Sequence, residues 1–194
     1  MEALRIIMDG RVEGREVTTW VNPESVADAE SLAARSLPFH EASHALVALH
    51  FGLHVRYVTI NRVEAVEATG DPSAAGHCAA EQAGLPPGDY CGPAGVLAMV
   101  AWAGIANDAK FGFPGAVIWG DPSAAVAAAA VHAPRDFAMF NQLLTNREAQ
   151  WDAKRWVYQF LLSNRDRVIV LGTALRDRGR LTGNEIREVL GGGD

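Results

Sequence analysis

Cysteine is scarce in this chain of 194 residues, and no C-x-x-C pair occurs. The two cysteines, Cys78 and Cys91, are therefore predicted to be free thiols and not ligands of a metal cluster. Free thiols are typical of a reducing compartment, and the acidic N-terminal stretch lacks the apolar core of a secretory signal. We therefore expect a cytoplasmic protein.

Long apolar runs and clustered basic charge are lacking as well. The longest uncharged apolar stretch, residues 92–107, is too short and too rich in glycine for a membrane span. The net charge is −6, and the C-terminal arginines alternate with acids, as on the solvated face of an amphipathic helix. The sequence thus predicts neither a membrane nor a nucleic acid as a partner.

A phosphate-binding loop of the form G-x-x-x-x-G-K-[ST] is also missing, which argues against an ATPase module in these residues. Hydrophobic residues make up 49% of the chain, and no low-complexity linker divides it, so one sizeable core is expected. We assign residues 23–194 to a single domain. Residues 1–22 are an N-terminal extension, with a predicted hairpin of strands at 4–8 and 16–21.

The most informative motif is His-Glu-Ala-Ser-His at residues 40–44. Apolar residues from 38 to 53 recur with a helical period, and on a helix His40 and His44 lie one turn apart on one face. Both imidazoles can then reach one metal ion, and Glu41 can take a proton from an attacking water. The alternative is that these are ordinary helix residues. A buried polar group without a partner costs about 1–3 kcal/mol, which favours Zn²⁺.

A zinc hydrolase needs a third protein ligand. His50 follows His44 by six residues and points away from the face that His40 and His44 share. The third ligand must therefore come from farther along the chain.

Several segments resemble, in the same order, the peptidase domain of the FtsH-type ATP-dependent metalloproteases. The strongest match is residues 39–61, where that family has an H-E-A-G-H-A helix followed by a strand reading V-x-x-V-T-I. Ser43 stands where the family has glycine. The resemblance implies an α+β, mostly helical, zincin-like domain with a small β-sheet beside the zinc helix. Weaker matches lie at 74–78, 96–112, 119–129 and 176–190.

The resemblance also implies a third ligand. The segment at 119–129 resembles the family's N-D-L-x-x-A-T helix, whose aspartate binds zinc, and this implies Asp121. Asp121 is also well placed to cap that helix, which would limit its freedom to bind zinc. The same hexapeptide, GDPSAA, occurs at 70–75, so Asp71 is an alternative. Asp108 is another, because the family also writes Asn-Asp before its ligand helix.

Residues 54–62 are rich in β-branched and aromatic side chains and are predicted to form a strand, with 74–80 as its partner. In the zincin proteases that the chain resembles, an extended peptide adds to an edge strand through main-chain hydrogen bonds. The alternative is that this strand is internal. The candidate substrate-binding residues are Tyr57, Val58, Thr59 and Ile60.

Helical periodicity and capping signals predict the remaining elements. A capping box from Thr182 to Glu185 is expected to open the last helix. The other helices are expected at about 23–35, 38–53, 93–111, 136–146, 148–163 and 165–178.

Together these patterns predict a zinc-dependent endopeptidase that acts on unfolded or flexible protein segments. Zn²⁺ would be held by His40, His44 and Asp121, with Glu41 as the general base. Because the chain lacks the family's ATPase, a peptide or protein substrate would arrive unaided or through a separate ATPase or adaptor, and a homo-oligomer like the family's rings is compatible with the sequence. The alternative is a catalytically silent zinc- or peptide-binding protein of the same fold.

Overall fold

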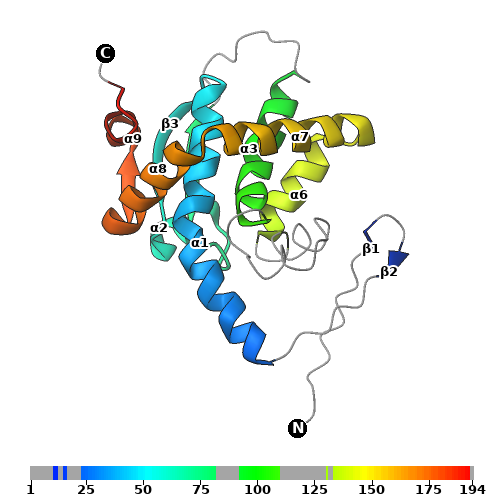
Figure 1. Ribbon diagram of the computed structural model, residues 1–194, viewed down its shortest axis with the longest axis horizontal. Coiled ribbons are helices and arrows are strands. Elements are labelled where there is room, and N and C mark those ends of the chain that lie inside the picture. Colours follow the sequence, from blue (N-terminus) through cyan, green and yellow to red (C-terminus); the bar gives the residue numbers. More distant parts are fainter. Residues whose placement is uncertain are drawn as a thin grey trace.

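The structure is a computed structural model of the chain (Figure 1). It describes residues 11–12, 15–16, 23–81, 92–109, 130 and 133–192, with side chains described from residue 35 onward. Asp121 and Cys91 lie outside the described residues. Among the described helices, none combines the length and the apolar character that crossing a membrane requires.

Helix α1 (Pro23–His50) runs through the middle of the molecule, with α3 (Gly92–Asn107) and α6 (Pro134–Leu143) on one side and the sheet on the other (Figure 1). The sequence predicts two helices here, separated before Pro38, and this prediction is wrong because the helix continues through Pro38. A proline inside a helix removes one main-chain hydrogen bond. Packing of α1 against α3 and α8 (Arg165–Arg178) offsets that loss.

The core forms where α3 packs against α1 and α6. Residues 40–48 of α1 are all buried, and residues 95–107 of α3 are buried apart from Leu97. Trp102 of α3 packs against Phe140 of α6, with 4.7 Å between the ring centroids. A helix that is apolar on nearly all sides belongs in a core. Polar side chains on this part of α1 must therefore find partners within the protein.

The C-terminal helices follow the sequence prediction closely. Helix α7 (Arg147–Ser163) begins at Asn146, whose side chain accepts hydrogen bonds from two backbone amides of the first turn. Helix α9 (Gly183–Val189) begins with the predicted capping box between Thr182 and Glu185, which is confirmed. Helix α2 (Arg62–Thr69) was not predicted, although Asn61 caps it in the same way.

Three short strands form one antiparallel sheet. Strand β3 (His54–Thr59) lies between β4 (His77–Glu81) and β5 (Arg180–Thr182), so the order is β4-β3-β5. The predicted pairing of β3 with the segment near 74–80 is confirmed. Val58 lies opposite Cys78 on one side and Leu181 on the other. Strand β3 is therefore the central strand of the sheet.

The prediction that β3 is an edge strand for substrate is consequently wrong. Tyr57, Val58 and Thr59 face partner strands on both sides, and the amide of Ile60 donates to the carbonyl of Gly179. The prediction failed because β5, which pairs with β3, has only three residues, and a segment that short shows no strand pattern in the sequence. Its pairing depends on the placement of α8 and α9, which flank it.

The N-terminal extension contains a short antiparallel pair, β1 (Arg11–Val12) with β2 (Arg15–Glu16). A pair of strands was predicted in this region, although at 4–8 and 16–21. Those ranges lie almost entirely outside the described residues. In the described part of the chain, the domain is mostly helical with a small antiparallel sheet, which confirms the α+β prediction.

Candidate metal centre

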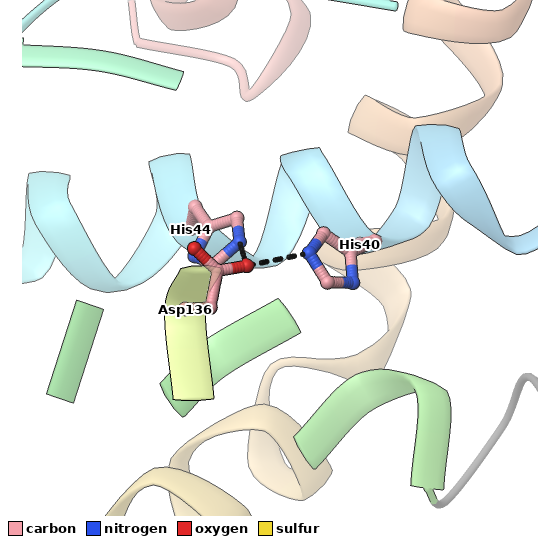
Figure 2. Close-up of side chains that lie close together, drawn as sticks. All are labelled: His40, His44 and Asp136. Carbon is pink, nitrogen blue, oxygen red and sulfur yellow. Dashed lines mark hydrogen bonds and ion pairs between the residues drawn. The ribbon is translucent and has the colours of Figure 1, made fainter. Parts of the chain in front are cut away.

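Two histidines of α1 and one aspartate of α6 converge on one point (Figure 2). His40 and His44 are buried and lie one helical turn apart, with 4.7 Å between their ring centroids. The Oδ2 atom of Asp136 is 3.1 Å from Nε2 of His40 and 3.3 Å from Nε2 of His44. One ligand atom from each of the three residues lies within 4.8 Å of the others, so the group can hold a metal ion.

The opposite nitrogen of each imidazole is held by α3. Nδ1 of His44 lies 2.6 Å from the carbonyl oxygen of Val100. A carbonyl only accepts, so this nitrogen must carry the proton and donate it. Nδ1 of His40 lies 2.7 Å from Oδ2 of the buried Asp108. Both rings therefore turn Nε2 toward Asp136, and in a neutral imidazole that nitrogen carries the lone pair that a metal binds.

Two glycines make room for the polar side chains of α1. A Cβ on Gly104 of α3 would overlap the ring of His40 at its Nε2 edge. A Cβ on Gly76, just before β4, would be 2.5 Å from Oε1 of Glu41. The cluster of His40, Glu41, His44, Asp108 and Asp136, which we call the centre, is thus enclosed by α1, α3, α6 and the start of β4.

Asp136 lies in the first turn of α6, after a proline that opens the helix. Burial opposes its ionisation, but the charge of His44 and hydrogen bonds with both histidines outweigh burial, so the pKa of Asp136 is held far below its usual range. Burial likewise disfavours charge on the imidazoles. The carboxylate of Asp108 nevertheless raises the pKa of His40, and that of Asp136 raises the pKa of His44. The centre is therefore built to attract positive charge.

Glu41 is 5% exposed and lies beside both histidines. Burial raises its pKa to about 7, against the opposing charges of His44 and His40. A carboxyl group with a pKa near neutrality can accept a proton and later return it at physiological pH. The predicted role of Glu41 as a base is thus compatible with its environment.

The three predicted third ligands have different outcomes. Asp121 lies outside the described residues, so its prediction stays a prediction. Asp71 is half-buried, accepts hydrogen bonds from the backbone and hydroxyl of Ser73, and is not part of the group that could hold a metal ion. Asp108 does reach the centre, but on the Nδ1 side of His40, where it orients the ring.

Asp136 is the residue that the sequence analysis missed. The sequence did indicate the helix start at which Asp136 lies, because a helix was predicted to begin at this position and a proline two residues earlier suits a first helical turn. Acidic residues are common in first turns, where they favour the helix dipole. Sequence alone therefore offers no reason to single out Asp136 as a ligand.

Two other predictions concern α1 itself. His50 points away from the pair, as predicted, and packs among Phe51, Trp156 and Phe160. Ser43 is fully buried, and its hydroxyl donates to the carbonyl of Phe39 one turn earlier. The serine hydroxyl is thus satisfied within the helix.

Strand β4 borders the centre next to Glu41. Burial, with smaller effects from Glu41 and Asp136, raises the pKa of the Cys78 thiol well above its usual value, so this free cysteine is neutral. His77 is half-buried with its ring 6.0 Å from that of Tyr57, and burial, then the charge of Arg135, lowers its pKa. Strand β4 therefore adds no negative charge to the centre.

Comparison of the chain with models of known protein families and with curated proteins finds no match.

Proposed function

We propose that this chain is a zinc-dependent endopeptidase. The observation that carries the proposal is the convergence of two imidazole Nε2 atoms and one carboxylate oxygen beside the buried side chain of Glu41. Two histidines and a carboxylate are a ligand set of catalytic zinc, which leaves a fourth position open. His40 and His44 with Asp136 would hold the ion.

The spacing of these atoms supports zinc. Ligands at the usual zinc distances of about 2.0–2.1 Å in a tetrahedron lie about 3.3 Å from one another. The distances from Asp136 Oδ2 to the two Nε2 atoms are 3.1 and 3.3 Å. Each imidazole also has an acceptor on its other nitrogen, as metal-bound histidines nearly always do. The two distances to Asp136 are therefore those that a tetrahedral zinc site needs.

The protein's own residues would divide the work as follows. When bound, Zn²⁺ supplies Lewis acidity and a water of lowered pKa. Glu41 takes the proton of the attacking water and delivers it to the leaving amine. Its burial against Gly76 keeps competing solvent from its carboxylate. Glu41 is therefore the group that moves the proton.

Substrate would bind at β4 and not at β3. Among the described strands β4 pairs with β3 alone, and we propose that its other edge accepts an extended peptide. The start of β4 follows Gly76, which contacts Glu41. A peptide added to this edge would therefore pass the catalytic base. Any unfolding of a folded substrate would need a separate ATPase or adaptor.

The test compares wild-type protein with Glu41→Gln on unfolded casein. Zinc content should be unchanged in the variant, while cleavage should fall by about 10²–10⁴-fold because the proton acceptor is gone. A chelator should abolish wild-type cleavage, and added Zn²⁺ should restore it. Glu188→Gln makes the same chemical change at an exposed residue of α9 and should leave activity intact.

The outcomes separate the proposed enzyme from a silent binding protein. Zinc bound by the wild type without any cleavage of casein or of a peptide library would favour a catalytically silent zinc-binding protein. Equal cleavage by wild type and Glu41→Gln would refute the mechanism.

A further inference from the structure

Asp108 is a buried charge of the centre to which the proposed mechanism assigns no step. The residue is 4% exposed and lies in the π-helical turn that follows α3. Its Oδ2 is 2.7 Å from Nδ1 of His40, and its Oδ1 accepts a hydrogen bond of 3.3 Å from Asn107. In the described part of the chain, His40 is the basic side chain that forms a hydrogen bond with the Asp108 carboxylate. A buried charge costs several kcal/mol unless it is compensated.

His44 shows that a charge is not needed to orient a ring. Its Nδ1 donates to the neutral carbonyl of Val100. Val100 and Gly104 of α3 and Asp108 of the turn that follows it are spaced at intervals of four residues, and Val100 and Asp108 each bond one of the two imidazoles. This segment thus supplies an acceptor for each imidazole and, at Gly104, the space for the His40 ring. An uncharged acceptor at position 108 would orient His40 just as well.

The charge itself therefore needs an explanation, and a bound cation provides one. Two neutral imidazoles contribute no charge to balance a divalent cation, so the buried carboxylates of the centre must supply it. Asp108 adds its negative charge through His40. A carboxylate on Nδ1 also makes Nε2 a stronger donor to the metal.

We propose that Asp108 is a positioning residue whose negative charge, beyond its hydrogen bond, strengthens metal binding through His40. The inference rests on the proposed metal centre, and it concerns affinity, which can be measured without any assay of catalysis.

The test measures the dissociation constant for Zn²⁺, by competition with a chromophoric chelator, in wild type, Asp108→Asn and Asp108→Ala. The asparagine oxygen can still accept the Nδ1 proton, so Asp108→Asn removes the charge and keeps the bond. We expect it to weaken zinc binding by about 10–100-fold. The absorption bands of bound Co²⁺ should keep their wild-type positions in Asp108→Asn, because the three ligands are unchanged, and shift in Asp108→Ala, where His40 loses its acceptor.

Asp177→Asn is the matched control, because it removes the same charge from an exposed aspartate of α8 and should leave the dissociation constant unchanged. Wild-type affinity in Asp108→Asn would overturn the inference. If Asp108→Asn does not fold, the zinc affinity of Asp108→Glu tests the inference instead, because glutamate keeps the negative charge. Binding within about tenfold of wild type supports the inference, and a loss beyond about 100-fold overturns it.

Failure of the proposed function looks different from failure of this inference. A wild-type chain that binds no zinc refutes the metal centre. A wild-type chain that binds zinc, loses affinity with Asp108→Asn and cleaves nothing refutes the enzyme and supports the role of Asp108.

Discussion

The centre can be compared with a second group of charged side chains, on the outer side of the sheet. That surface cluster consists of Tyr57, Glu64, Glu67 and Arg180, which line a cavity of about 280 Å³ with Ala68. Nη1 of Arg180 lies 3.3 Å from Oε2 of Glu64, and its guanidinium lies 4.4 Å from the Tyr57 ring centroid. Both groups thus combine acids, bases and an aromatic or imidazole ring.

The surface cluster and the centre differ in how deeply their charged side chains are buried. The side chains of Arg180 and Glu64 are 47% and 32% exposed, whereas those of His40 and Asp108 are 9% and 5% exposed. In the surface cluster the Arg180–Glu64 pair is within ion-pair distance, yet Oε2 of Glu64 has no aligned hydrogen bond. In the centre, both nitrogens of each imidazole have a partner. Water can replace a lost partner more readily in the surface cluster than around the buried His40 and Asp108, so equal substitutions should have unequal effects.

The largest effect is expected for Asp136→Ala, because it removes the only carboxylate that meets both Nε2 atoms in the described part of the chain. Zinc affinity should fall by more than about 100-fold, which exceeds the usual loss for a residue outside the ligand set. Metal analysis after dialysis, with chelator competition, measures this. Asp121→Ala is the companion variant, and we expect it to keep wild-type affinity. Loss of zinc in Asp121→Ala together with wild-type affinity in Asp136→Ala would identify Asp121 as the third ligand.

A smaller effect is expected for Gly104→Ala, whose new Cβ would overlap the His40 ring. Gly172→Ala is a matched control, because its Cβ would overlap the ring of Phe39, which is not part of the centre. Each crowded site should lower the free energy of unfolding by about 1–3 kcal/mol in urea titrations. Only Gly104→Ala should also weaken zinc binding, by about tenfold or more. Equal zinc affinity in the two variants would show that the His40 ring can shift without loss.

The smallest effect is expected at the surface cluster, with Arg180→Ala. Exposed ion pairs are worth about 0.2–1 kcal/mol, and salt screens them. A double-mutant cycle with Glu64→Ala should therefore give a coupling in that range, which disappears at high salt, and zinc affinity should not change. A coupling above about 2 kcal/mol would mean that this cluster is organised like the centre, and the comparison would fail.

Local patterns accounted for much of the fold. The helices from residue 134 onward and the capping box at Thr182 follow from periodicity and from side chains that bond backbone groups a few residues away. The continuity of α1 through Pro38 and the position of β3 between two strands were predicted wrongly. Both depend on packing with segments far away in the sequence, which outweighs local preference.

The sequence by itself determined the half of the centre that lies on one helical turn. A spacing of four residues places His40 and His44 on one face wherever α1 lies, and Glu41 follows with them. Only the tertiary structure decided what faces them. Asp136 is separated from His40 by 96 residues and Asp108 by 68. Both roles arise because α3 packs against α1 and α6 packs against α3. The sequence marks many aspartates as fit to bind a cation, and it is the packing of buried helices that brings particular ones to the histidines.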